Sequence, residues 1–288
     1  MNTERAKNQP ETGVLKARVK AYWSRETCGT YVAKAVKYTR EYFDEIEEYR
    51  YRVEPEVFPF AQFTRFHGQK ILEAGIGAGT DFIQWVRAGA RAYGLDLTEE
   101  AVEHVNKRLE VYGLAAEDVR VADVENLPYP DNTFDLVYSW GVIQYTPDTR
   151  KALAEIIRVT RPGGLIKIMV YNRHSLWVLY KYLRYGMLRG RPFVNLSSLI
   201  YDRCAGGGAR AFTAGEIKNW LVPYPVTIRA QRAGVTRYDL LRHVPAGRLV
   251  RFAAYILACL GGMDRCGWFM TFELEKTGTT VPEDGRRQ

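Results

Sequence analysis

The chain has 288 residues, 47% of them hydrophobic, which is enough to build a folded core, and its length fits either two domains or one elaborated α/β domain. The formal net charge of +8 comes from basic residues spread from Arg5 to Arg287, and no nucleic-acid-binding module is recognisable, so we expect no nucleic-acid partner. The first 13 residues are polar and no segment approaches the ~20 apolar residues of a membrane-spanning helix, so we expect a cytoplasmic protein.

The four cysteines, Cys28, Cys204, Cys259 and Cys266, are scattered along the chain. None forms a Cys-x-x-Cys pair or another spacing typical of metal ligands. We therefore expect free thiols and no metal site.

The N-terminal region, residues 1–65, begins with 13 residues that we expect to be unstructured. From Val14 to about Val53 apolar residues recur at three- and four-residue steps, which predicts helix, and Pro55 and Pro59 are expected to end it. Its aromatic side chains either pack on the core or contact a ligand. They are Tyr22, Trp23, Tyr31, Tyr42 and Tyr49.

Residues 66–172 alternate between strand and helix patterns. The expected strands are 70–74, 91–95, 118–122, 134–139 and 165–171, and the expected helices are 80–88, 99–112 and 149–159. This alternation predicts a doubly wound, mostly parallel sheet. Helix 99–112 has clear end signals, because Thr98 is a good N-cap and Gly113 a good terminator. Ligands of such sheets bind at the carboxyl ends of the strands.

The first of these strands runs into a turn with three alternating glycines, Gly75, Gly77 and Gly79, preceded by Glu73. Glycine suits a tight turn that a ligand approaches closely. The dinucleotide fingerprint has its third glycine one place later. The Glu73 carboxylate would also repel a pyrophosphate and suit a cationic ligand.

Two further acids end neighbouring strands. Asp96 follows Gly75 by 21 residues, where a ribose diol could be held, and Asp123 ends the third strand, where a carboxylate could accept an adenine amino group. Their positions at matching strand ends predict one shared site for an adenosine ligand.

Together these residues resemble the class I S-adenosylmethionine (SAM) dependent methyltransferases, over roughly residues 65–172. The motifs that carry the resemblance are Glu73-x-Gly75-x-Gly77-x-Gly79, Asp96, Asp123, Phe134-Asp135-Leu136-Val137 and Arg161-Pro162-Gly163-Gly164. The flanking segments resemble bacterial small-molecule methyltransferases of biosynthetic gene clusters. These segments are Tyr22-Trp23 with Cys28-Gly29-Thr30, Glu41-Tyr42-Phe43-Asp44, and Asn126-Leu127-Pro128-Tyr129-Pro130-Asp131.

The resemblance implies an α/β, Rossmann-like fold: a doubly wound, mostly parallel seven-stranded sheet with an N-terminal helical lid over the cofactor and a helical insertion after strand five. It implies SAM as cofactor and S-adenosylhomocysteine as product. The cofactor-binding residues it implies are Glu73, Gly75, Gly77, Gly79, Asp96, Leu97, Asp123, Val124 and Ser139.

The C-terminal half divides into an insertion (173–210), a segment that completes the sheet (211–277) and a polar tail (278–288). In the insertion, the pattern from Leu176 to Arg191 predicts one helix. Three roles stay open for it: a substrate lid, a dimer face or a membrane-surface helix. We expect a flexible joint at Gly206-Gly207-Gly208. The sheet-completing segment has a helix to about Trp220, strands at 226–229 and 268–274, and an apolar helix at 249–260.

Methyl transfer from a sulfonium needs alignment of the acceptor and exclusion of water, and a hydroxyl or protonated amine acceptor also needs a base. The loop after the fourth strand carries Gln144 and Tyr145 where related enzymes often have histidine, so Tyr145 either orients a polar substrate or packs. His174, just after the fifth strand, is the best placed histidine for a base, and Arg173 could bind an anionic group.

We therefore expect a SAM-dependent methyltransferase acting on a small molecule, with oxygen as the first choice of acceptor atom and nitrogen, sulfur or carbon open. Tyr145 and His174 are the catalytic candidates, and the expected substrate contacts are Tyr42, Gln144, Tyr145 and Arg173. Two alternatives stay open: a lipid or quinone methyltransferase at the membrane surface, and a SAM-binding regulatory or scaffold protein without turnover. Peripheral membrane contact and a homodimer are also compatible with the sequence.

Overall fold

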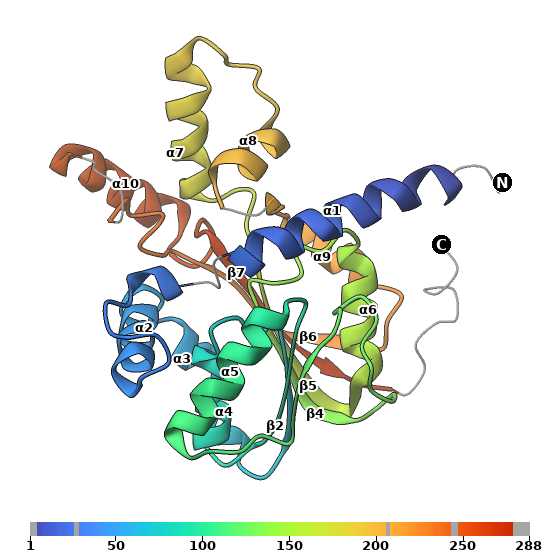
Figure 1. Ribbon diagram of the computed structural model, residues 1–288. Coiled ribbons are helices and arrows are strands. Elements are labelled where there is room, and N and C mark those ends of the chain that lie inside the picture. Colours follow the sequence, from blue (N-terminus) through green and yellow to red (C-terminus); the bar gives the residue numbers. More distant parts are fainter. Residues whose placement is uncertain (1–4, 26–28, 206–207, 243–246, 279–288) are drawn as a thin grey trace.

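The computed structural model describes residues 5–25, 29–205, 208–242 and 247–278, and the side chains from residue 13 onward within these ranges (Figure 1). Cys28, the Gly206-Gly207 part of the expected joint and nearly all of the expected tail lie outside the described residues. The described cysteines, Cys204, Cys259 and Cys266, are free thiols, as expected.

Seven strands of the described chain form one sheet, in the order β3-β2-β1-β4-β5-β7-β6. The parallel part consists of β3 (Asp118–Val121), β2 (Arg91–Asp96), β1 (Lys70–Ala74), β4 (Phe134–Trp140) and β5 (Thr160–Tyr171). At one edge β7 (Phe269–Lys276) runs antiparallel between β5 and β6 (Val226–Gly234). The predicted Rossmann-like, mostly parallel seven-stranded sheet is confirmed.

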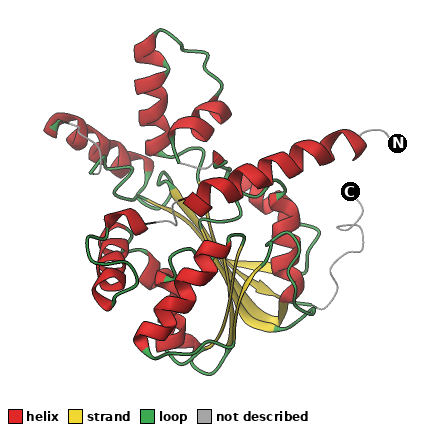
Figure 2. Ribbon diagram, in the orientation of Figure 1, coloured by secondary structure: helices red, strands yellow, loops and turns green. Residues whose placement is uncertain are grey.

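Helices cover both faces of the sheet and give three layers (Figures 1 and 2). One face carries α2 (Arg40–Val53), α4 (Thr80–Arg87) and α5 (Glu99–Tyr112), and the other carries α6 (Thr149–Val159) and α9 (Ala214–Leu221). A hydrophobic core lies on each face of the sheet. Successive side chains of β1 point to opposite faces, so Ile71 packs in one core and Leu72 in the other. A parallel strand buried on both faces is continuously apolar for this reason.

Local capping explains where α5 begins and ends. The Thr98 hydroxyl oxygen accepts a hydrogen bond from the Ala101 amide at 3.4 Å, and Gly113 closes the helix with φ of 65°. This helix has the bounds that the sequence predicts, since its signals are all local.

The N-terminal region differs from the expected single helical run. It contains α1 (Arg5–Arg25), the short turn η1 (Thr30–Val32) and α2, so part of the stretch expected to be unstructured is helical. Gly29 has φ of 83°, and the Thr39 side chain accepts from the Tyr42 amide to start α2. Pro59 lies inside α3 (Val57–Ala61), where its missing N–H costs no hydrogen bond in the first turn, and η2 (Phe63–Phe66) leads into β1.

The expected helix from Leu176 to Arg191 is also divided. It ends at Tyr185 as α7 (Leu176–Tyr185), with η3 (Met187–Arg189) and a further helix, α8 (Leu196–Arg203), behind it. A side chain at Gly186 would lie 2.7 Å from the Tyr182 carbonyl oxygen, so the chain turns at this glycine. The apolar helix expected at 249–260 is present as α10 (Arg248–Gly261). Every helix in the described part of the chain is too short or too polar to cross a bilayer.

Candidate active site

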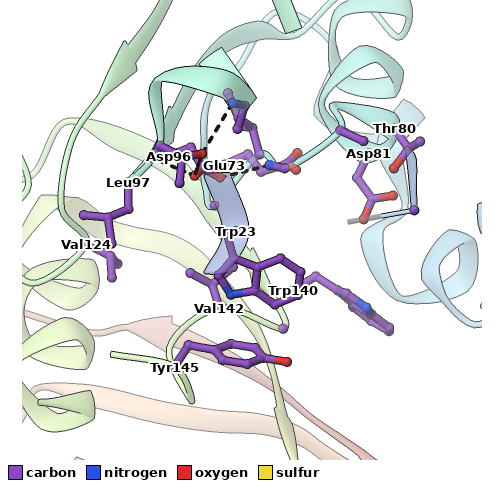
Figure 3. A pocket seen from close by; sticks show the side chains of 18 of the residues that line it. Trp23, Glu73, Thr80, Asp81, Asp96, Leu97, Val124, Trp140, Val142 and Tyr145 are labelled. Atoms are coloured by element: carbon purple, nitrogen blue, oxygen red, sulfur yellow. Dashed lines mark hydrogen bonds between the residues drawn. The ribbon is translucent and has the colours of Figure 1, made fainter. Parts of the chain in front are cut away.

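A cavity of about 280 Å³ lies at the carboxyl ends of the parallel strands, and side chains of α1 line one side of it (Figure 3). This volume is near the lower end of the range for small-molecule sites, roughly 300–1,000 Å³. Its walls come from the turns after β1, β2, β3 and β4, from α1 and α2, and from the antiparallel edge of the sheet. Polar groups gather in one half of the cavity and aromatic rings in the other.

The glycine turn after β1 is held tightly against its neighbours. The amides of Gly75 and Ile76 both donate to the Leu95 carbonyl oxygen, at 2.8 and 3.1 Å. Gly75 has φ of 86°, and a Cβ there would lie 2.2 Å from a methyl group of Val142. Gly77 has φ of 49°, but no atom lies within 4 Å of the place where its Cβ would be. The turn therefore packs on one side and leaves open space on the other, as a cradle for a ligand requires.

Asp96 sits at the end of β2 and faces this turn. One carboxylate oxygen accepts from the Gly77 amide at 3.0 Å, and the other accepts from the amide and hydroxyl of Thr98 at 3.0 and 2.9 Å. Burial raises the pKa of Asp96, partly offset by these hydrogen bonds. The carboxylate is thus fixed in direction at the cavity wall, which suits a ligand with paired hydroxyl groups.

Glu73 lies deeper, 4% exposed, and accepts from the indole N–H of Trp85 at 2.9 Å. Burial, with the charge of Asp81, holds the pKa of Glu73 well above its ordinary value. Asp81 accepts from the Arg50 guanidinium and the Tyr138 hydroxyl, each at 3.0 Å. Burial beside Asp81 thus opposes the charged form of Glu73, which still lines the cavity, and its contact with a cationic ligand stays a prediction.

Asp123, after β3, is covered by the N-terminal helix. The Lys16 ammonium forms an ion pair with Asp123 and a second one, at 2.7 Å, with the buried carboxylate of Glu125. Nearby, Lys20 pairs with Glu99 at 2.8 Å and the Ser24 hydroxyl donates to Glu100 at 2.7 Å. Three side chains of α1 thus bind acids that follow β2 and β3, while Lys16, Val19, Lys20 and Trp23 of the same helix line the cavity.

The other half of the cavity is aromatic. Trp23 of α1 meets Tyr145 edge to face with ring centres 5.3 Å apart, and the hydroxyls of Tyr145 and Tyr171 share a hydrogen bond of 3.2 Å. Figure 3 shows Trp23, in this view, between the group around Asp96 and the ring of Tyr145. Trp140, Tyr238 and Phe269 complete this wall. Such a surface accommodates a flat or branched apolar molecule.

Most of the expected cofactor residues line the cavity: Glu73, Gly75, Gly77, Asp96, Leu97, Asp123 and Val124. Gly79 is instead the N-cap residue of α4, and a Cβ at this position would lie 2.6 Å from a methyl group of Val105. Ser139 is fully buried, and its hydroxyl donates to the Ala74 carbonyl oxygen at 3.1 Å, which holds β4 to β1. Neither of these two side-chain positions forms part of the cavity wall.

Of the expected substrate and catalytic residues, only Tyr145 lines the cavity. Tyr42 is buried against His104, Arg173 pairs with Glu216 at 3.1 Å, and Gln144 is enclosed behind the wall. His174 is exposed, and its amide donates to Asn172 as the chain leaves β5. The expectation that His174 is a base is corrected, because the chain turns away from the cavity after Tyr171.

Several cavity residues carry no sequence signal that would have selected them. Lys16 and Arg50 reach the site from helices α1 and α2. In the sequence nothing distinguishes them from the many other basic residues of the N-terminal region. Val142 lies in the loop after β4, which has no motif that marks this residue. Phe269 and Tyr238 belong to the far end of the chain, where only the packing of β7 against β5 brings them to the cavity.

The comparison with known families matches residues 72–168 to a family described as a methyltransferase domain. These residues contain the glycine turn, Asp96, Asp123 and the loop with Tyr145. Residues 72–168 thus match a methyltransferase domain, and we use that name for this region below.

The curated relatives of the methyltransferase domain match over little more than its own length. A malonyl-acyl-carrier protein O-methyltransferase from Serratia marcescens is 37% identical over 109 residues, which cover 38% of this chain and 41% of that protein. A protein of the same name from Erwinia billingiae is 36% identical over 114 residues, which cover 39% and 43%. The chain therefore spans about two-fifths of the length of these relatives.

Solved structures share the fold over a longer stretch. A geranyl diphosphate methyltransferase in complex with GPP and sinefungin has a TM-score of 0.62 at 16% identity, covering 91% of this chain and 99% of that one. Geranyl diphosphate C-methyltransferase from Streptomyces coelicolor A3(2) has a TM-score of 0.59 at 14% identity, covering 91% and 98%. These likenesses show that the regions around the methyltransferase domain belong to the same fold.

The boundary of the methyltransferase domain divides the cavity. The glycine turn and both strand-end acids lie inside residues 72–168, whereas Trp23, Tyr171, Tyr238 and Phe269 lie outside them. The matched residues thus supply the glycine turn and both acids together with Trp140 and Tyr145, and the rest of the aromatic wall comes from segments outside them.

Proposed function

We propose that this protein transfers a methyl group from SAM to a small, mainly apolar acceptor, with oxygen as the acceptor atom. The observation that carries the proposal is the divided cavity, in which a glycine turn and two strand-end carboxylates adjoin a wall of aromatic rings. The methyltransferase domain supports the first half of this reading, and the lining of the second half supports the choice of acceptor.

Each part of SAM has a matching residue in the polar half of the cavity. Asp96 would accept hydrogen bonds from the two ribose hydroxyls, and Asp123 from the adenine amino group, while Leu97 and Val124 would flank the adenine ring. The open space at Gly77 would admit the ligand against the main chain. When bound, SAM supplies a methyl group already activated on its sulfonium, so the residues of the chain need only orient the acceptor and exclude water.

The aromatic half favours an uncharged acceptor. The cationic side chains at the cavity, Lys16, Lys20 and Arg50, are all paired with carboxylates: Asp123, Glu99 and Asp81 respectively. A free acidic acceptor such as a malonyl group would have to compete with these carboxylates, which is costly in a buried setting. An apolar ring or branched chain would contact Trp140, Phe269 and Trp23 without such competition.

The aromatic wall carries two polar features: the hydroxyl pair of Tyr145 and Tyr171, and Glu54, which accepts from the Trp140 indole N–H at 3.0 Å. We assign Tyr145 the role of orienting a hydroxyl of the acceptor through its own hydroxyl oxygen, which lies 3.2 Å from that of Tyr171. Tyr145→Phe retains the ring contact with Trp23 and removes this group. For a neutral hydrogen bond of about 1 kcal/mol, kcat/KM should fall about five- to tenfold.

The test of the cofactor begins with calorimetric titration of the protein with SAM and with S-adenosylhomocysteine. Asp96→Ala should weaken binding by about 3 kcal/mol, since hydrogen bonds to a charged group contribute about 1.5–3 kcal/mol each. Glu117→Ala, which removes an exposed carboxylate at the opposite end of the sheet, is the matched control. Absence of binding by the wild type, or equal binding by both variants, would refute the cofactor assignment.

Turnover is tested separately with methyl-labelled SAM and a panel of phenols, isoprenoid alcohols and acyl thioesters. Label transfer to a phenol or isoprenoid alcohol would support the proposal. Preference for a malonyl thioester would reject the uncharged acceptor. Tight SAM binding with no transfer to any of them would favour the reading of a SAM-binding protein without turnover.

A further inference from the structure

Helix α10 is apolar on nearly every side and yet lies almost entirely on the surface. Ala258 is its one buried residue among those described. Leu249 is 84% exposed, Leu260 80% and Phe252 64%. A helix of this composition is normally covered by core, by a partner or by lipid. Within the described chain nothing covers it.

A second apolar group lies beside it. The α7 region exposes Leu183, Met187, Leu188 and Phe193, the last at 97%. Helix α10 packs against α7, and the Leu176 amide donates to the Cys266 carbonyl oxygen at 2.9 Å. Figure 1 shows α7, α8 and α10 projecting from the same end of the molecule, away from α4 and α6. We call residues 176–203 and 248–265 the α7–α10 face.

The α7–α10 face is strongly basic. It contains eight basic residues and two acidic ones, Asp202 and Asp264. The basic residues are Lys181, Arg184, Arg189, Arg191, Arg203, Arg248, Arg251 and Arg265.

Aromatic rings hold several of these cations. Lys181 lies 4.2 Å from the ring centre of Trp177, and Arg189 and Arg203 lie 5.1 and 5.3 Å from that of Tyr185. No salt bridge between described residues involves these three cations. Apolar tips surrounded by uncompensated positive charge match an interface between hydrocarbon and anionic headgroups.

We propose that the α7–α10 face docks on the surface of a bilayer that contains anionic phospholipid. A second copy of the chain fits this face poorly, because it would bring two strongly basic surfaces together. Nucleic acid would match the charge but not the exposed leucines and phenylalanines. A lipid surface satisfies both features, with the apolar side chains inserted and the arginines among the headgroups.

The α7–α10 face lies behind the aromatic half of the cavity. Tyr238, which lines the cavity, has its ring centre 6.0 Å from that of Trp177 in α7, and Tyr171 stacks at 4.3 Å on Trp268. Docking would therefore bring the aromatic end of the cavity close to the bilayer. The proposal rests on the surface alone and holds whatever reaction the cavity performs.

The experiment is flotation of the full-length protein with vesicles of phosphatidylcholine alone and of phosphatidylcholine with 30% phosphatidylglycerol. We expect flotation with the anionic vesicles, weakened as salt is raised because surface charge is screened. Leu249→Glu and Leu260→Glu should each lower the partition coefficient about tenfold, since each removes an inserted apolar side chain. The double variant Arg184→Glu, Arg189→Glu should abolish the preference for anionic vesicles.

The matched controls are Val222→Glu, at an apolar position that is 79% exposed beyond α9, and Lys218→Glu on α9 itself. Both should float like the wild type. Circular dichroism and thermal unfolding, compared with the wild type, verify that each variant is folded. Flotation that is absent, equal with both vesicles, or equally reduced by the controls would overturn the proposal. So would a dimer in sedimentation velocity that Leu249→Glu dissociates while vesicle binding is lacking.

Discussion

The Lys16 ammonium lies against the carboxylate of Asp123, 107 residues further along the chain. The same ammonium donates to Glu125 at 2.7 Å. Burial alone would lower the pKa of Lys16, but its hydrogen bonds to Asp123 and Glu125 outweigh burial and raise that pKa. The lysine therefore stays charged and fastens α1 over the carboxylate that we assign to the adenine amino group.

Lys16→Met should loosen α1. The lost ion pairs are partly buried, and a contribution of about 1 kcal/mol predicts about fivefold faster local opening. The measurement is the rate of chymotrypsin cleavage in α1, which contains Tyr22 and Trp23. Lys20→Met, which removes a more exposed pair with Glu99, should change the rate less. Equal rates for both variants would show that Lys16 does not secure the helix.

Two glycines of the turn should respond differently to alanine. Gly75→Ala places a Cβ 2.2 Å from Val142 in a backbone conformation with φ of 86°, so we expect a loss of about 2–4 kcal/mol of stability. Gly77→Ala meets open space and should lose about 1 kcal/mol, from its positive φ alone. Denaturant unfolding compares the two. Weaker SAM binding by Gly77→Ala at nearly wild-type stability would place the ligand against that glycine.

His104 is expected to make stability depend on pH. Burial, with the positive charges of Arg108 and Lys37, lowers the pKa of His104 from 6.5 to about 4. In the folded protein the imidazole stays neutral while the unfolded chain takes up a proton. Stability is therefore lost as pH falls from 6.5 towards 4, by about 3 kcal/mol for a shift of this size.

Other buried groups titrate as well, so the measurement is the difference in unfolding free energy between wild type and His104→Phe across that range. The variant lacks the proton uptake, and its stability relative to the wild type should rise as the pH is lowered. A difference that does not vary with pH would contradict the buried, neutral histidine. The variant also removes the 3.2 Å contact with the Tyr42 hydroxyl, which adds a constant offset.

Gln144 is fully buried, and neither polar atom of its amide has a hydrogen-bond partner in the described chain. An unsatisfied buried amide costs about 1–3 kcal/mol, so Gln144→Met should raise the stability by about 1 kcal/mol. Gln84→Met is the matched control and should lower stability, because the Gln84 amide donates to Glu47 at 2.8 Å. These effects are read from thermal unfolding.

The same variant tests the sequence-based expectation that Gln144 contacts the substrate. The Gln144 amide lies beside Gly141, which lines the cavity, whereas Gln144 itself does not line it. An unchanged KM in Gln144→Met would remove it from the site. An increased KM would show that the acceptor satisfies the buried amide.

The cofactor half of the site could be read from the sequence because its determinants are local. A strand that leads into alternating glycines, and strands that end in Asp96 and Asp123, specify backbone geometry within a few residues of each motif. Helix 99–112 was predictable for the same reason, since Thr98 and Gly113 act on their immediate neighbours. The parallel arrangement of the strands then brings the separate ends to one edge.

What the amino-acid sequence determined by itself is therefore the sheet, its order of motifs and the class of ligand at its carboxyl edge. The tertiary structure alone decided that Lys16 covers Asp123, that His174 turns outward, and that Tyr238 and Phe269 join Trp23 in one wall. It also brought α7 and α10 into contact. These contacts join segments far apart in the chain, and they depend on how whole elements pack, which no local pattern of residues encodes.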